Sequence, residues 1–304
     1  MAVGMKRPEQ LYTVLADVTP TDRRVLLHSF NGFLDAGAAS RLAVDSMIAN
    51  LDHRLIASFD SDELIDFRAR RPKMTYSVDH FVSVEVPTVT LHELIDDQGQ
   101  PFLLLAGPEP DFQWGLFLAA VHELVERFDV ALTVGFGAIP WPAPHTRPIG
   151  VTVHGNDPSL LTGYVSPLGE IEVPGSVGSM IELSLAEAGH ASMGVSVHVP
   201  HYLVQFEYPR AAMKVIATSA EVADLVIPFE ALEPSALTAE AEIASQLDGN
   251  EEFGSVVGAL ETQYDEMTQL ANEMPSGDEI AASVEQFLAE MNAANDEGKD
   301  EQQP

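Results

Sequence analysis

The sequence predicts an α/β protein with a partly parallel sheet that helices cover on both faces, followed by an acidic helical extension. Short apolar runs typical of buried strands alternate with segments of helical periodicity between residues 25 and 223. Helical periodicity alone continues beyond residue 229. Residues 215–304 hold 21 acidic residues and one basic residue. This change in composition predicts an α/β domain at residues 1–228, a helical extension at 229–294 and a disordered tail at 295–304.

The first half of the predicted domain begins with a buried strand that leads into a helix. Val25–Phe30 is a continuous apolar run that Asn31-Gly32 ends, and small apolar residues at helical spacing follow from Asp35 to Leu51. Turn residues at Asp96–Gly99 predict a hairpin between the last two strands of this half. The further strands predicted here are Arg54–Phe59, Thr75–Val86, Val89–Ile95 and Phe102–Ala106.

The second half repeats the alternation of helices and strands. Asp111 is placed to cap a helix, and four prolines between Gly137 and Pro148 predict an irregular loop. Ser176 is expected to cap a later helix that ends at Gly189. The elements predicted are the helix Phe112–Phe128, the strands Asp129–Gly135, Ile149–His154 and Ala191–Val199, and the helices Ser176–Glu187 and Pro209–Ala223.

The extension has a pattern that favours association. Apolar residues from Phe253 to Met274 alternate spacings of four and three, which is a heptad repeat, and a capping box at Ser276–Glu279 opens a second helix. A helix with such an apolar face must pack on something. We expect it to pack on an α/β domain, its own or a neighbour's, and the subunits to form a small closed homo-oligomer, with a trimer as one expected size.

Composition and charge exclude several classes of function. The 304 residues contain no Cys, which excludes disulfides, thiolate metal sites and a cysteine nucleophile. The formal charge of −32 opposes binding to nucleic acids and to anionic membranes. No apolar run is long enough to span a bilayer, so a cytoplasmic location is expected. We expect no metal and no organic cofactor, because the sequence has neither an HExxH motif nor a dinucleotide-binding glycine pattern.

Three motifs are incomplete. Gly32–Ser40 resembles a P-loop, but Ala38 stands where the phosphate-binding Lys belongs, and Asp35 is better explained as a helix cap. His122 and Glu126 form half of a zinc motif and are more typical of a surface pair. Gly175–Ser179 lacks the spacing of a nucleophilic serine turn.

A candidate pocket is predicted where the carboxyl ends of the strands meet at one edge of the sheet. It would gather the turn that contains Asn31, Asp35 and Gly37 with the loop residues His145 and Arg147. Arg147 is the only basic residue between Arg127 and Arg210, so it is the natural contact for an anion, with a structural ion pair as the alternative. Two further histidines are candidates for this pocket, although ordinary hydrogen-bonded roles are the alternative: His198 and His201.

Several segments together resemble the PAC2 family, which is named for proteasome assembly chaperone 2. The likeness covers about residues 20–220 and follows the expected order. The segments that carry it include NGFLDAGAASRLAVDSMIANL, TVGFGAIPWPAPHTRP and EVPGSVGSMIELSLAEAGHASMGVSVHVPHY. The subgroup it resembles is the bacterial one with an added C-terminal helical part.

The resemblance implies a three-layer α/β/α domain with a phosphorylase/hydrolase-like mixed sheet. It also implies a non-catalytic role, because the eukaryotic and archaeal relatives bind proteasome α-subunits during ring assembly. Some relatives dock through a hydrophobic–Tyr–X terminus, from which Glu301–Pro304 departs. A proteasome-related partner is thus an expectation from the resemblance alone.

Two hypotheses about function remain open from the sequence. The first is a non-catalytic assembly or interaction protein that works as a homo-oligomer. The second is a small-molecule hydrolase or phosphorylase-like enzyme with its pocket at the strand ends. A pocket with bound phosphate or a nucleoside would favour the enzyme, and a flat apolar patch beside the acidic helices would favour the interaction protein.

Overall fold

The computed structural model describes residues 6–32, 35–164 and 169–273. Two compact units follow from the contacts within the chain, Met1–Glu251 and Glu252–Pro304. The first unit contains the main sheet, a separate hairpin and the helices up to α6 (Glu233–Asp248). The described part of the second unit is α7 (Glu251–Glu273). The capping box at Ser276–Glu279 and the predicted tail at 295–304 lie outside the described residues.

In the described part of the chain, eight strands form one mixed sheet in the order β1-β3-β6-β7-β2-β8-β10-β9. The four central strands, β7, β2, β8 and β10, run parallel, and the strands at either side join antiparallel. Their bounds are β1 Tyr12–Val14, β2 Arg24–Asn31, β3 His53–Phe59, β6 Thr90–Ile95, β7 Pro101–Pro108, β8 Val130–Trp141, β9 Val151–Gly155 and β10 Ser192–Pro200.

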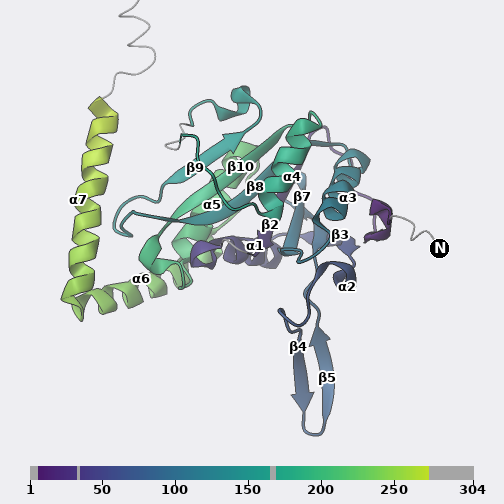
Figure 1. Ribbon diagram of the computed structural model, residues 1–304, viewed down its shortest axis with the longest axis horizontal. Coiled ribbons are helices and arrows are strands. Elements are labelled where there is room, and N and C mark those ends of the chain that lie inside the picture. The colour runs from purple at the N-terminus through teal and green to yellow at the C-terminus, as the bar shows by residue number, and fades with distance from the viewer. Residues whose placement is uncertain (1–5, 33–34, 165–168, 274–304) are drawn as a thin grey trace, which may run out of the picture. The chain divides into compact units, whose positions relative to one another are not determined.

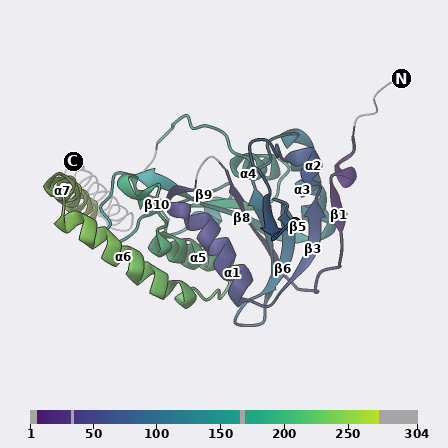
Figure 2. The same ribbon diagram turned by 90° about the horizontal axis from the view of Figure 1, so that it is seen from below.

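Helices cover both faces of the sheet, as the three-layer prediction requires. α1 (Ala39–Asn50) and α5 (Pro209–Ala223) pack on one face, whereas α3 (Trp114–Arg127) and α4 (Val177–Glu187) pack on the other (Figure 2). Successive residues of β2 separate the two cores, because side chains of a strand alternate between faces. Val25 and Leu27 are buried under α1 and α5, and Leu26 is buried under α3.

The predicted irregular loop Gly137–Pro148 is wrong in its first part. β8 continues to Trp141 and pairs with β10 in parallel as far as Trp141↔Pro200. Pro140 cannot donate a hydrogen bond, but β2 pairs with β8 only as far as Gly135. At Pro140, β8 therefore pairs with β10 but not with β2 among the described strands. A strand tolerates proline on such an unpaired side.

The predicted single strand Thr75–Val86 is also wrong, because the segment is a hairpin. β4 (Lys73–Ser77) and β5 (His80–Glu85) pair antiparallel in a separate two-stranded sheet. We call this hairpin the arm; it extends from the end of α2 (Ser61–Leu64) away from the main sheet (Figure 1). Val78 in the turn has φ of +56°, a conformation that a β-branched residue rarely adopts. A valine at this position therefore does not predict a turn.

The helix caps agree with the sequence in one case and differ in another. Ser176 caps α4 by accepting a hydrogen bond from the Ser179 amide, and Gly189 follows the helix with φ of +88°. Asp111 does not cap α3, which begins after a left-handed Gln113. The Asp111 carboxylate instead accepts from the Asp66 amide and pairs with Arg70.

From Glu230 to Glu273 the described chain is helical, apart from a break at Gly249 and Asn250. α6 packs against α5 within the first unit, and the heptad pattern from Phe253 falls on α7. None of the described helices is both long enough and apolar enough to cross a membrane.

Candidate functional site

The carboxyl ends of the parallel strands place all seven candidate residues near one edge of the sheet, but their side chains do different things. Asn31 is the last residue of β2, and its carbonyl oxygen accepts from the Glu109 amide at 3.0 Å. Asp35 accepts from the amides of Ser40 and Arg41, at 2.7 and 3.2 Å. Asp35 thus occupies the amides at the start of α1, so this helix start is not open to an anion.

Gly37 has a structural role in the same turn. Its φ of +68° suits glycine, and a Cβ there would lie 2.9 Å from the Cβ of Tyr208. The Gly37 amide donates to the Val204 carbonyl, and its own carbonyl accepts from the Tyr208 amide. The turn is therefore tied by its backbone to the segment that precedes α5.

His198 is buried on the opposite face of β10 from the α5 core. Its neighbours Val197 and Val199 pack under α1 and α5, so strand alternation directs His198 to the other face. The ring stacks on Trp141, and the Thr152 hydroxyl hydrogen-bonds to its Nε2 at 2.9 Å. Burial lowers the pKa of His198 to about 4, so the ring is neutral at pH 7. These contacts fit the alternative of an ordinary hydrogen-bonded histidine.

The loop after β8 lies beside α5 and forms the rim of an open hollow of about 430 Å³. The hydroxyl of Tyr202 lies 2.8 Å from His145 Nδ1 and accepts from the His145 amide at 2.9 Å, whereas His201 is exposed beside the Tyr202 ring. His145 and Arg147 line the hollow, and the other five candidates do not. The remaining lining residues are Pro148, Ile149, Tyr208, Arg210, Met213, Lys214, Ala217, Phe229 and Glu240.

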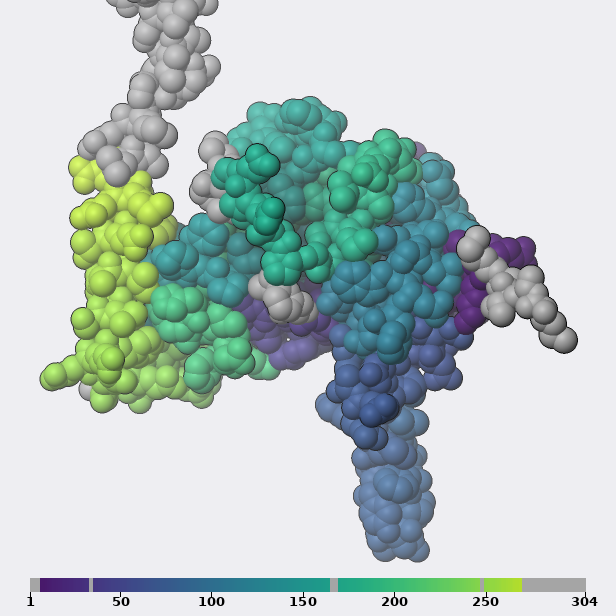
Figure 3. Space-filling view, in the orientation of Figure 1, coloured from purple at the N-terminus to yellow at the C-terminus, as the bar shows by residue number. Residues whose placement is uncertain are grey.

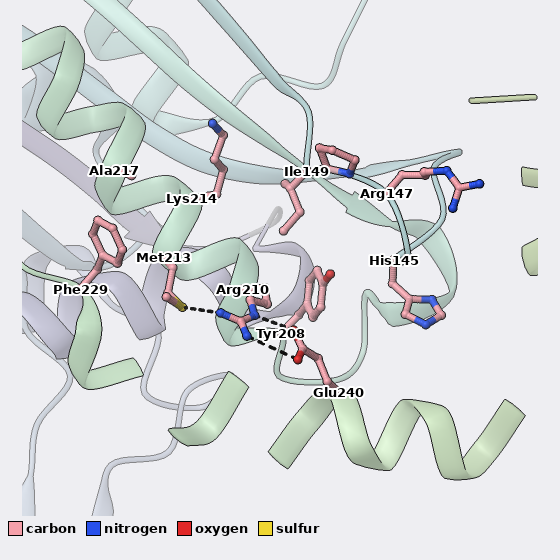
Figure 4. A pocket seen from close by; sticks show the side chains of 11 residues that line it. His145, Arg147, Ile149, Tyr208, Arg210, Met213, Lys214, Ala217, Phe229 and Glu240 are labelled. Atoms are coloured by element: carbon pink, nitrogen blue, oxygen red, sulfur yellow. Dashed lines mark hydrogen bonds and ion pairs between the residues drawn. The ribbon is translucent and has the colours of Figure 1, made fainter. Parts of the chain in front are cut away.

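Two of the charged residues that line this hollow, Arg210 and Glu240, pair with each other. Arg210 forms ion pairs with Glu233 and Glu240, and its guanidinium lies between Met213 and Glu240 (Figure 4). Hydrogen bonds to Glu240 and Glu233 raise the pKa of Arg210. Burial raises the pKa of Tyr208 to about 12, so its phenol stays protonated and is a poor nucleophile. The arrangement joins α6 to α5 and does not present a nucleophile beside a base.

The arm is the feature that sequence reasoning missed. Every residue of β4 and β5 is exposed, and Figure 3 shows the arm standing clear of the rest of its unit. The register pairs Met74 with Val84 and Tyr76 with Phe81, and a bulge at Val82 keeps these four side chains on one face.

The two faces of the arm differ sharply in polarity. On the apolar face, the exposed fractions are 54% for Met74, 57% for Tyr76, 63% for Phe81 and 52% for Val84. The Tyr76 and Phe81 rings lie edge to face at 5.2 Å. The other face is polar and consists of the pairs Lys73–Glu85, Thr75–Ser83 and Ser77–His80. An isolated hairpin with an uncovered apolar face is at best marginally stable in water, so this face favours a partner.

The arm also begins in the most basic part of the sequence. Residues 68–73 contain four of the 15 Lys and Arg residues and no acidic residue. Arg70 is held by Asp111 and by the Glu109 carbonyl. Arg68, Arg71 and Lys73 are exposed, and the described residues supply no ion pair to them. The alternation of Met74 and Tyr76 with polar residues, beside this basic block, is the signal that could have revealed the arm.

Most of the chain is similar in sequence and in fold to known proteins. The model of the PAC2 family matches residues 29–247. The Mycobacterium tuberculosis protein Rv2714, of unknown function, is 42% identical, with a TM-score of 0.81 over 86% of this chain and 91% of its own. A protein of unknown function from Corynebacterium glutamicum is 39% identical, with a TM-score of 0.81 over 85% of this chain and 98% of its own.

A more distant structure shares the fold. The M. tuberculosis proteasome-assembly chaperone homologue Rv2125 is 22% identical, with a TM-score of 0.70 over 77% of this chain and 99% of its own. A search of curated protein sequences finds no match. The family match extends over more than two thirds of the sequence and agrees with the three-layer fold. The chain therefore belongs to the PAC2 family.

Proposed function

We propose that this protein is a non-catalytic interaction protein that works as a homo-oligomer, in the manner of an assembly chaperone. The observation that carries the proposal is the apolar face of the arm, formed by Met74, Tyr76, Phe81 and Val84, which no described residue of the same chain covers. Such a face is stabilised when another protein surface removes it from water, by roughly 25 cal/mol for each Å² of apolar surface buried.

Family likeness supports the same class of function. Rv2125 is a homologue of proteasome-assembly chaperones, and an assembly chaperone acts by binding other proteins. We propose that the partner of the assembled oligomer is likewise a protein, with a proteasome component as the candidate to test. The hollow beside α5, where ion pairs occupy Arg210, gives the alternative of an enzyme no comparable support.

The test compares the two faces of the arm. Replacing Tyr76→Thr and Phe81→Thr removes the two rings while keeping a residue that favours strands. Replacing Ser77→Thr and His80→Thr changes the neighbouring pair on the polar face and serves as the matched control. Light scattering after gel filtration should give an oligomeric mass for the natural protein and for the control, and a reduced mass for the ring variant.

Two results would contradict the proposal. A single-chain mass for the natural protein over the micromolar range would refute the homo-oligomer. An oligomer of unchanged size and affinity in the ring variant would show that the apolar face is not an assembly surface. Circular dichroism on each variant establishes that the sheet and helices are folded before the masses are compared.

A further inference from the structure

A segment before α4 pairs with no described strand and has a pattern of polar and apolar side chains that would complement the arm. Residues 169–175 are all exposed and belong to no helix or strand. Within them Glu170-Ile171-Glu172-Val173 alternates acidic and apolar side chains, with exposed fractions of 56% for Ile171 and 66% for Val173. Such alternation is typical of a strand with one apolar face.

The backbone of this segment is also available for pairing. No backbone hydrogen bond links residues 170–174 to any other described residue. Exposed N–H and C=O groups of this kind can add a strand to an open sheet edge. The arm offers such edges, because β4 and β5 pair only with each other among the described strands.

We propose that residues 170–173 of one copy of this chain add to the β4 edge of the arm of a second copy. The inference rests on the proposed function, because it names the surface through which the homo-oligomer forms. Ile171 and Val173 then join the apolar face beside Met74 and Tyr76. Glu170 and Glu172 fall on the polar face, since side chains two residues apart share a face.

The charges favour the β4 edge over the β5 edge, and they favour a second copy of this chain as the partner. Lys73 lies on the polar face of β4 and Arg71 precedes it, whereas Glu85 occupies the corresponding end of β5. The two glutamates therefore meet cations at β4 and a like charge at β5. With a formal charge of −32, the chain presents an acidic surface to its copies, and the basic block that leads into the arm complements it.

A contact between two different surfaces has a consequence for symmetry. The arm of the first copy binds the segment of the second, whose own arm remains available for a third. Such a head-to-tail contact closes into a ring when the rotation between neighbours allows it. The small closed oligomer expected from the sequence is thus the natural product of this docking.

The absence of Cys from the natural sequence allows a direct test by disulfide formation. In the full chain, Thr75→Cys combined with Glu172→Cys places a thiol on the polar face of each surface. After mild oxidation, a denaturing gel should show disulfide-linked dimers and higher species. The matched control combines Ser83→Cys on β5 with Glu172→Cys and should stay unlinked, because β5 lies one strand farther away, beyond the reach of a disulfide.

Several outcomes of the gel would overturn the docking. Linkage by Thr75→Cys alone would mean that arms pair with arms. Linkage in the Ser83→Cys control would place the segment on the β5 edge. A disulfide confined to one chain, or no linkage while the mass stays oligomeric, would also refute it. None of these gel results refutes the proposed function, which fails instead if the natural protein has a single-chain mass or if the ring variant keeps its oligomer unchanged, so the two failures are distinguishable.

A charge exchange provides a second, independent measurement. Arg71→Glu with Lys73→Glu should weaken self-association at least tenfold in sedimentation equilibrium, and adding Glu170→Lys with Glu172→Lys should restore it. Failure of the second pair to restore association would contradict the contact. Binding of the natural protein to vesicles of anionic lipid, lost in the ring variant, would assign the apolar face to a membrane surface and overturn the proposal.

Discussion

The indole of Trp141 stacks on the imidazole of His198, with ring centroids 3.9 Å apart and an angle of 12° between the planes. The Thr152 hydroxyl hydrogen-bonds to the same imidazole from β9. The stack therefore joins β8, β10 and β9 at the carboxyl edge of the sheet. Any side chain at Gly150 would press on it, since a Cβ there would lie 2.7 Å from His198 Nδ1.

Neutral buried histidines should make the protein less stable in weak acid. Burial lowers the pKa of His198, and also that of His28, from 6.5 to about 4. Between pH 6.5 and pH 4 the unfolded chain binds protons that the folded chain does not, so the free energy of unfolding falls as the pH falls through this range. Above pH 6.5 both states are neutral at these rings and the effect is absent. The full loss is roughly 3 kcal/mol per histidine.

Urea denaturation at several pH values checks this expectation. His198→Gln should make the free energy of unfolding less dependent on pH between 6.5 and 4. His201→Gln, at an exposed ring three residues away, should leave the dependence as it is. Equal pH dependence in the natural protein and in His198→Gln would show that this ring does not titrate as its burial requires.

The sequence predicted the edge at which these residues gather but not the face on which each side chain lies. His198 follows a buried strand, as a site residue would, yet strand alternation places it opposite the α5 core. His145 and Arg147 do line a hollow there, with Tyr208 just before α5 and Arg210 in its first turn, much later in the chain. Long-range packing brings those two pairs together, and spacing along the chain carries no information about it.

Most central strands were predictable because each is a continuous apolar run buried on both faces. β2 and β10 agree with prediction to within a residue or so at each end. The arm was missed because Val78, an ordinary strand former, occupies its turn in a left-handed conformation. The prediction ends β8 too early, because proline generally breaks strands. Pro140 is tolerated because β2 does not pair with this end of β8.

Loss of the cap at α1 should lower stability without affecting the arm. Asp35→Ala leaves the Ser40 and Arg41 amides without their acceptor and should lower the free energy of unfolding by about 1 kcal/mol. Asp35→Asn keeps one acceptor oxygen and should lose less. Chemical denaturation gives both values. An unchanged free energy of unfolding in Asp35→Ala would mean that water replaces the carboxylate as acceptor and that the cap does not stabilise the fold.

Removing Arg210 should loosen α6 from α5. The Arg210 guanidinium donates to Glu233 at 2.6 and 2.8 Å and to Glu240 at 2.5 Å. Because both carboxylates are partly exposed, Arg210→Ala should lower the free energy of unfolding by only about 1 kcal/mol. Limited proteolysis should nevertheless cut within residues 224–233 sooner. Arg210→Lys keeps the charge but cannot bridge both carboxylates with a planar fork, so its cleavage rate should be intermediate. Unchanged cleavage in Arg210→Ala would contradict this role.

The turn of the arm should become more stable when Val78 is replaced by glycine. Val78 has φ of +56° and is 93% exposed, so its side chain strains the backbone and gains no burial within the chain. A two-residue turn with positive φ at its first position favours glycine there. Val78→Gly should therefore slow amide hydrogen exchange in β4 and β5, by an amount that corresponds to about 1 kcal/mol. Asp79→Gly, one residue on, introduces glycine where φ is not positive and should speed exchange instead. Faster exchange in Val78→Gly would show that contacts of the valine side chain, and not the turn geometry, hold the tip of the arm.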